Sequence, residues 1–216
     1  YNRTRQVNLD SKKLAQSNGY FEYSDEQVSN RISNIRAGLS NAASEPPDLS
    51  TKPQAAVAAI IRTGAKDLEI LFIRRSHRQG DPWSGHLAFP GGRLEKQDAS
   101  PKEAAERETL EEIGLPLVRA DYLGPLRSLA GLTLPVSVSA FAYFIRETPS
   151  FTFSEEIQST FWTSFSDLKD PNKRTSYELK NPAGSQSFEA LNVLGPNDPV
   201  LWGITYRFTQ QLIDLT

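Results

Sequence analysis

Three glutamates near the middle of the chain are spaced so that a helix would bring their carboxylates together. Glu108, Glu111 and Glu112 stand at i, i+3 and i+4, which places them on one helical face. Like charges at this spacing repel one another, so a cation is expected among them. Clustered carboxylate oxygens suit Mg²⁺ or Mn²⁺, which bind carboxylates and substrate phosphates together. A solvated acidic helix face is the alternative interpretation of these three residues alone.

The residues around these glutamates resemble the Nudix box, the signature of the Nudix hydrolase superfamily. Arg107–Leu115 matches the second half of that box, except that Thr109 stands where the family has an aliphatic residue. Gly91-Gly92 opens the first half, which is one residue longer than the family's pattern, and Asp98 stands near the place of the family's glutamate. The resemblance covers residues 55–165.

Upstream residues are most similar to the coenzyme A pyrophosphatase branch of this superfamily. That branch has an Arg-Ser…Gly…Phe-Pro-Gly-Gly signature, here Arg75-Ser76 and Leu87–Gly92. The stretch from Arg75 to Gly85 is one residue longer than the signature, and Gly80 replaces its second arginine, with Arg78 nearby. The resemblance implies metal-dependent hydrolysis of a diphosphate, that of coenzyme A or acyl-coenzyme A, to 3′,5′-ADP and (acyl-)4′-phosphopantetheine.

Two other functions stay open at this stage. One keeps the chemistry and changes the substrate, as in a Nudix pyrophosphatase acting on NADH, ADP-ribose or an oxidised nucleoside triphosphate. The other is a non-catalytic Nudix-fold module that binds a nucleotide. The intact set Glu108, Glu111 and Glu112 favours an enzyme, because a pure binder need not retain three repelling carboxylates.

The resemblance also implies roles for the residues of the box. The expected metal ligands are Glu108, Glu111, Glu112 and the main-chain carbonyl of Gly92. Glu111 and Glu108 are the leading catalytic residues. Arg107 is expected to pair with the carboxylates of the box and hold them in place, with Asp98 as its partner, a task that supports the metal ligands.

Four residues are expected to contact the substrate. Gly91 and Gly92 permit positive φ angles and a close approach of the backbone to the ligands, or form a simple tight turn. Arg75 and Arg93 have the fork geometry that binds phosphate oxygens in pairs, and solvated surface positions are equally compatible with their place in the sequence.

The general base is not determined by the sequence. Members of this family draw it from the box or from a later loop, so Glu155 and Glu156 are candidates, and we select Glu156. His77 and His86 are distant from the carboxylates in sequence and are expected to have loop or structural roles. Trp83 is expected to pack in the core, with stacking on a base as the alternative.

The N-terminal fifty residues are expected to be an arm and an amphipathic helix, followed by the Nudix domain over 51–216. Ser24 caps the helix with Gln27 three residues later, and its apolar residues are Val28, Ile32, Ile35 and Leu39. The helix is interpreted as a packing element or, alternatively, as the interface of a homodimer. The stretch 41–53 is expected to be a linker.

Apolar spacing and capping residues also predict the helices and strands that would position the site residues. A helix is expected from Ser100 as N-cap to Ile113, ended by Gly114, and packed through Ala104, Ala105, Thr109 and Leu110. Strands are expected over 55–62, 68–74, 87–89, 122–128, 136–145 and 161–163, a loop-rich region over 166–199, and a helix over 202–215. The predicted fold is α/β, a Nudix-type α/β/α sandwich with a mixed sheet and an N-terminal helical extension.

Composition excludes several other classes of protein. The net charge of −2 gives no basic surface to attract nucleic acid, and no apolar run reaches ~18 residues, so neither nucleic acid nor membrane partners are expected beside a small diphosphate substrate. The absence of cysteine excludes a disulfide framework, and with no signal-like start it favours an intracellular protein, cytoplasmic or organellar rather than secreted. Because the sequence begins with Tyr1, targeting segments can lie outside it.

Overall fold

The computed structural model describes residues 24–42, 54–131, 135–181 and 184–216. Within them, a mixed sheet of eight strands has the order β3-β2-β1-β7-β5, with β4 and β6 paired to β1 and β7, and β8 to β2. The strands are β1 Gln54–Thr63, β2 Leu68–Arg75, β3 Leu87–Ala88, β4 Gly91–Arg93, β5 Asp121–Pro125, β6 Leu129–Ala130, β7 Ser137–Ile145 and β8 Ile157–Ser164. β1 and β7 are parallel, and the other pairs are antiparallel.

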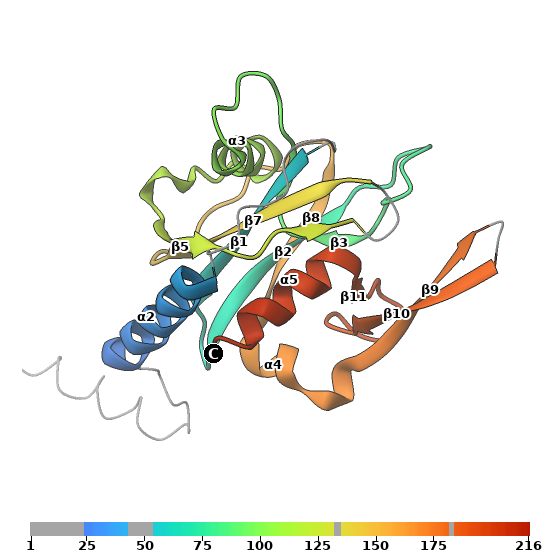
Figure 1. Ribbon diagram of the computed structural model, residues 1–216. Helices are drawn as coiled ribbons and strands as arrows, with labels where there is room; N and C mark the ends of the chain where they lie inside the picture. Colours follow the sequence, from blue (N-terminus) through green and yellow to red (C-terminus); the bar gives the residue numbers. More distant parts are fainter. Residues whose placement is uncertain (1–23, 43–53, 132–134, 182–183) are drawn as a thin grey trace, which may run out of the picture.

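Alternating residues of the sheet divide the core into two layers. On β2, Ile70 and Phe72 join the buried cluster that includes Ile35 of α2 (Asp25–Ala42), whereas Leu71 and Ile73 join the cluster on the other face. Helix α3 (Pro101–Ile113) covers the second face, and α2 and α5 (Gly203–Ile213) cover the first (Figure 1). The predicted α/β/α sandwich is therefore confirmed.

The N-terminal helix packs within its own chain. Ser24 and Gln27 form the expected reciprocal cap, with Gln27 N donating to Ser24 Oγ at 3.2 Å and Ser24 N donating to Gln27 Oε1 at 3.0 Å. Ile32, Ile35 and Leu39 are buried in the core cluster shared with the sheet. Packing thus accounts for the apolar side of this helix, and the homodimer stays an untested prediction.

The region 166–199 is not the loop-rich stretch that we expected from the sequence. It contains α4 Phe165–Lys169, the 3₁₀ turn η3 Pro171–Lys173, β9 Arg174–Asn181 and β10 Gly184–Leu191, and β11 Leu201–Trp202 completes a second sheet of order β11-β10-β9. The β9–β10 hairpin projects from the body of the protein (Figure 1). Its outer half is exposed on both faces, so it lacks the apolar alternation by which strands are predicted.

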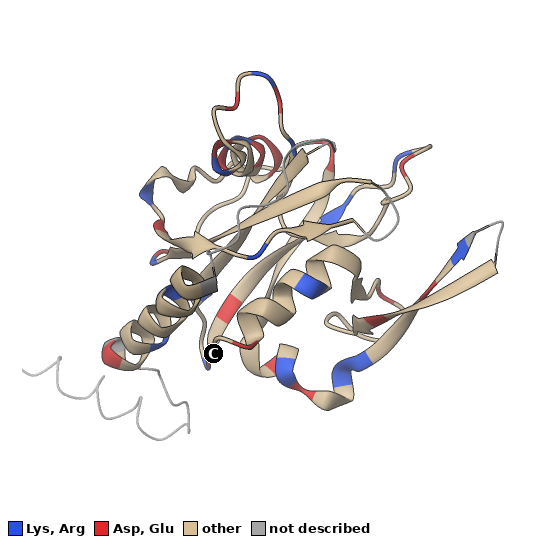
Figure 2. Cartoon of the chain, viewed as in Figure 1, with Lys and Arg blue, Asp and Glu red and all other residues tan. Residues whose placement is uncertain are grey.

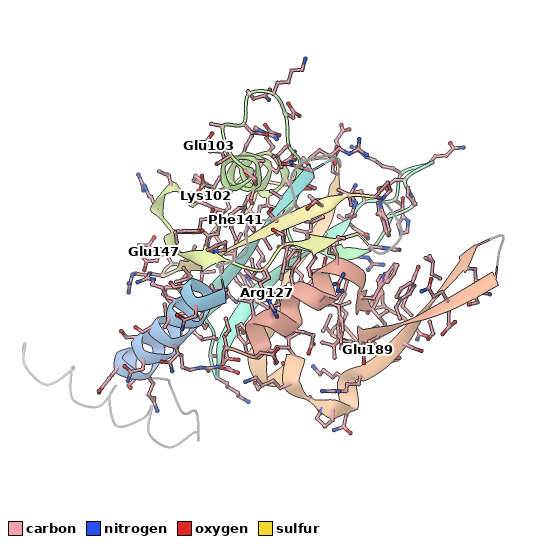
Figure 3. All side chains as sticks on the ribbon, in the orientation of Figure 1. Lys102, Glu103, Arg127, Phe141, Glu147 and Glu189 are labelled. Atoms are coloured by element: carbon pink, nitrogen blue, oxygen red, sulfur yellow. The ribbon has the colours of Figure 1, made fainter. Side chains whose placement is uncertain are left out.

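Other elements differ from the predictions mainly at their ends. β5 ends at Pro125 rather than at 128, because the pairing with β7 shifts register between Tyr122 and Gly124 and then stops. β8 begins at Ile157, earlier than the predicted strand. The C-terminal helix is α5, and its Phe208 is fully buried. The side chain of Gln211 exchanges two hydrogen bonds with the backbone of Arg127, which lies beside α5 (Figure 3).

The described helices include none that is both long and apolar enough to cross a membrane. The predicted arm over 1–23 and most of the linker, 43–53, lie outside the described residues.

Candidate active site

The acidic helix α3 is fixed at both ends by local interactions. Ser100 Oγ accepts a hydrogen bond from Glu103 N at 3.2 Å, Pro101 begins the helix, and Gly114 ends it with φ of 71°. These caps are as predicted, although the Glu103 carboxylate accepts from Ala99 N at 3.0 Å rather than from the cap residue itself. Acidic residues make up much of this helix (Figure 2).

The side of α3 that meets the sheet differs from the prediction. Ala104, Ala105 and Thr109 are buried as expected, but Leu110 is 50% exposed and Glu112 only 4%. At 100° per residue, Leu110 lies far round the helix from Ala105 and Thr109, whereas Glu112 falls between the directions of Ala104 and Ala105. The helix therefore turns a carboxylate rather than a leucine toward the interior.

That buried carboxylate meets the glycine loop of β4. Gly91 N donates a hydrogen bond to Glu112 Oε2 at 2.9 Å, and Gly91 has φ of 148°. A Cβ on Gly91 would lie 2.2 Å from the carbonyl oxygen of Ala56, and one on Gly92 would lie 2.4 Å from the carboxyl carbon of Glu108. Only glycine lets the loop approach β1 this closely at Gly91, because the Ala56 carbonyl is backbone, whereas at Gly92 the added atom would meet the end of the Glu108 side chain.

Arg107 holds the outer part of the site together. Its Nε and Nη2 each donate to Asp98 at 2.9 Å, and Nη1 donates to Glu108 and Glu111 at 3.1 Å each. Nη2 also donates to the carbonyl of Arg93 at 3.2 Å. The side chain of Asp98 is only 3% exposed, and the hydrogen bonds from Arg107 hold its pKa below the ordinary value. The expected pairing of Arg107 with Asp98 is thus observed.

Two of the three glutamates are held away from water. Burial raises the pKa of Glu112 to about 8 and that of Glu108 above its ordinary value. Glu111 is 58% exposed and is turned toward Arg107. The described side chains contain no preformed cluster of three or more acidic, histidine or cysteine groups around a metal position. The donor chemistry nevertheless fits a hard cation, because a positive charge beside Glu108 and Glu112 would offset their desolvation.

A second group of charges faces Glu112 from the end of β2 and the loops beside it. Burial has the largest effect on the pKa of Glu112. Among the nearby charges, Arg75 lowers this pKa, whereas Glu108 and Glu156 raise it. Arg75 Nη2 donates to Asp81 at 3.1 Å, and Arg78 donates to Glu156 at 2.9 Å. The structure therefore brings Arg75 and Glu156 to the same site as the acidic helix, although they are far from it in sequence.

The remaining predicted site residues lie farther out. The side chains of Arg93, Glu155 and His77 are exposed. Burial lowers the pKa of His86, whose ring makes edge contacts with Trp83, Tyr177 and Trp202. Trp83 packs in this aromatic group but is only partly buried and belongs to neither of the core clusters of the described residues, so it does not lie in the core as predicted.

Asp81, which fixes Arg75, was not among the predicted site residues. An acidic residue a few positions after an arginine in a short loop was the signal available for that pairing.

The sandwich and its acidic helix define a Nudix-type hydrolase domain. A family model described as NUDIX domain matches residues 52–180, more than half of the chain, so the chain belongs to the Nudix family. A protein of Schizosaccharomyces pombe described as uncharacterized is 36% identical over 118 residues, which are 51% of this chain and 36% of that protein. The uncharacterized Nudix hydrolase NudL of Pectobacterium atrosepticum is 28% identical over 132 residues, 60% of this chain and 66% of the relative. The matches span less than two thirds of these curated relatives.

One solved structure agrees with the fold. A MutT/nudix family protein from Enterococcus faecalis has a TM-score of 0.50 at 15% identity, and the match covers 98% of this chain and 74% of that one. A C. elegans Ap4A hydrolase has a TM-score of 0.45 at 23% identity, with 53% of this chain and 82% of that chain covered. At these identities the likenesses do not indicate a substrate.

Replacing Asp98 by Asn tests the Arg107 ion pair through its pH dependence. Because the folded-state pKa of Asp98 is lowered, the pair contributes stability above the unfolded-state pKa of about 4, and this is lost as pH falls through the folded-state value. We expect the difference in free energy of unfolding between wild type and Asp98→Asn to be constant from about pH 5 to 7 and to shrink below about pH 4. Urea unfolding at each pH measures it.

The exposed pair of Asp121 with Arg146, whose side chains are 39% and 78% exposed, provides the control. Asp121→Asn is expected to change the free energy of unfolding by less than about 1 kcal/mol at every pH. A wild-type advantage over Asp98→Asn that grows toward acid pH would contradict the assignment.

Proposed function

We propose that the protein is a Mg²⁺- or Mn²⁺-dependent diphosphatase whose preferred substrate is coenzyme A or acyl-coenzyme A, cleaved to 3′,5′-ADP and (acyl-)4′-phosphopantetheine. The observation that carries the proposal is that a buried carboxylate, Glu112, and a partly buried one, Glu108, meet at one glycine loop, where the charge of Arg75 lowers the pKa of Glu112. Carboxylates for a cation and an arginine for phosphate are the groups that a diphosphate requires. The upstream Arg75-Ser76 and Phe89–Gly92 residues support coenzyme A over other diphosphates.

The cation would be held by the carboxylates of α3 and the backbone of β4. Glu108, Glu111 and Glu112 are the proposed side-chain ligands, and the main-chain carbonyl of Gly92 is the fourth. When bound, the cation supplies charge neutralisation of the diphosphate and activation of a water molecule. Arg107 orients Glu108 and Glu111, both of which accept its hydrogen bonds in the free protein.

Arg75 and Arg93 are the proposed phosphate contacts, with Gly91 and Gly92 forming the wall of the site. Arg75 is the better placed of the two arginines, because its charge already acts on Glu112 and Asp81 fixes its orientation. Arg93 is exposed at the edge, with its carbonyl bound by Arg107, so its side chain can reach outward to the substrate.

Glu156 is the proposed general base. Its side chain is 46% exposed, its charge acts on Glu112, and its backbone carbonyl accepts from Ser76 N at 2.7 Å. The neighbouring Glu155 is exposed and has no such link to the acidic helix. A carboxylate held in this position can accept the proton of the attacking water.

Incubating the protein with Mg²⁺ or Mn²⁺ and a panel of diphosphates tests the proposal. The panel holds coenzyme A, acyl-coenzyme A, NADH, ADP-ribose and an oxidised nucleoside triphosphate, with products resolved by mass. We expect 4′-phosphopantetheine to form fastest and a chelator to abolish its release until the cation is restored, because the charged diphosphate is then unshielded. Preference for another panel member would reject coenzyme A, and no cleavage of any would favour the nucleotide-binding module.

Glu111→Gln tests the acidic helix. Losing one charged ligand is expected to lower kcat by roughly 100-fold or more while leaving the fold intact. Glu103→Gln is the matched control, since Glu103 lies on the same helix at its capped start (Figure 3) and glutamine keeps an acceptor for Ala99 N. The kcat of the control should stay near wild type. Equal losses in both variants would show that the effect comes from the helix and not from the site.

Substitutions of the neighbouring residues Glu156 and Glu155 test the assignment of the general base. Glu156→Gln is expected to lower kcat by about 100-fold and to remove the acid limb of the pH dependence of kcat/KM, because that limb reports protonation of the base. Glu155→Gln should keep both the rate and the limb. A full acid limb in Glu156→Gln would assign the base to the acidic helix instead.

A further inference from the structure

We propose that Trp202 is a positioning residue for the phosphate-binding arginine, Arg75. Trp202 supports the loop of residues 76–86 from the C-terminal sheet, and that loop determines where the guanidinium of Arg75 points. The proposal rests on the diphosphatase function for its kinetic consequences, whereas the structural support of the loop can be measured without any substrate.

Trp202 is the centre of a group of five aromatic side chains. It is 6% exposed, and the ring of Tyr177 on β9 stacks on it with centroids 3.9 Å apart and planes at 15°. Phe188 on β10 lies at 5.4 Å, and His86 and Trp83 of the loop at 5.5 and 6.2 Å. Rings at these separations attract each other through their quadrupoles and bury large apolar areas. Trp202 therefore joins the hairpin to the loop.

A continuous series of contacts leads from these rings to Arg75. Trp83 N donates to Asp81 Oδ1 at 2.9 Å, and Asp81 Oδ2 accepts from Arg75 Nη2 at 3.1 Å. The backbone closes the same loop, since Arg75 N donates to the carbonyl of His86 at 3.0 Å and Gly85 N donates to the carbonyl of Arg75 at 3.2 Å. Both loop residues that rest on Trp202 are thus within one contact of Arg75 or of its carboxylate partner.

Arg75 depends on this loop for its orientation. Its side chain is 25% exposed, and its Nε is buried without a hydrogen bond to any described residue. Asp81 is therefore the anion that fixes the guanidinium in the free protein. If the loop shifts, Arg75 loses that guide and its alignment with a phosphate, and misplacement by about 1 Å can be costly for a site.

The support comes from beyond the matched family segment. The family model ends at residue 180, whereas Phe188 and Trp202 follow it in β10 and β11. The C-terminal segment of this chain therefore contributes to a site whose carboxylates all lie inside the matched segment. Trp202, on the short strand β11 next to β3, is suited to supporting the loop, because its ring contacts two loop residues at once.

Kinetics of Trp202→Ala test the proposal. Misaligning a group that binds the substrate equally in the ground and transition states raises KM and leaves kcat nearly unchanged, so we expect KM to rise roughly tenfold. Trp202→Phe should restore most of the wild-type KM, because a ring stays in place. Phe208→Leu, on the buried side of α5, is the matched control for lost apolar packing, and its KM should not change.

A double-mutant cycle with Arg75→Gln shows whether Trp202 acts through Arg75. In the Arg75→Gln background, Trp202→Ala should raise KM by less than about twofold, because the group that it positions is already gone. If the two increases in KM multiply, the proposal is overturned. Tyr177→Ala, which removes only the stacked neighbour, is used in the same cycle if Trp202→Ala does not fold.

Hydrogen exchange separates this proposal from the diphosphatase function. In the free protein, the amides of Arg75 and Gly85 should exchange at least about tenfold faster in Trp202→Ala than in wild type, and at the wild-type rate in Phe208→Leu. Unchanged exchange in Trp202→Ala overturns the support of the loop. Faster exchange in a protein that cleaves no diphosphate would uphold the support and reject the proposed function alone.

Discussion

The site depends on shielding two carboxylates from water, at least in part, beside the two consecutive glycines of β4. Glu112 is almost fully buried and accepts a hydrogen bond from Gly91, and Glu108 touches Gly92 so closely that a single Cβ would collide with it. Burying a carboxylate is unfavourable unless a donor or a cation offsets the lost hydration. The raised pKa of Glu112 expresses that cost in the free protein. The glycine loop and the arginine pairs can each be understood as a response to that cost.

Ordinary packing in the sandwich positions these carboxylates. Ala104 and Ala105 are small, so α3 lies close on the sheet and brings its carboxylates down to β4. The guanidinium of Arg107 forms ion pairs with Asp98, Glu108 and Glu111, and its positive charge partly offsets their negative charge in the outer part of the site. On the opposite face of the sheet, α2 and α5 complete the core. The two helical layers therefore have different roles. Helix α3 carries charged residues of the site, and α2 and α5 support the sheet from its other face.

The C-terminal sheet adds a second kind of support. Its hairpin is polar and largely exposed, yet Tyr177 of β9 stacks on Trp202 of β11, and both rings lie against His86 of the loop before β3. Aromatic rings combine large apolar area with few rotatable bonds, so they can hold a loop without burying any of its polar backbone. The loop in turn carries Asp81, the carboxylate that pairs with Arg75.

Local interactions determined what could be predicted from the sequence alone. The caps Ser100 and Gly114, the spacing of the glutamates and the pairing of Arg107 with Asp98 all involve residues at most nine positions apart in the sequence. Tertiary packing decided the rest. It selected Glu112 over Leu110 for the interior, because the rotation of α3 depends on the sheet that it covers. It also built the polar β9–β10 hairpin and brought Arg75, Glu156 and Trp202 toward one loop, contacts between segments whose separation in sequence carries no local signal.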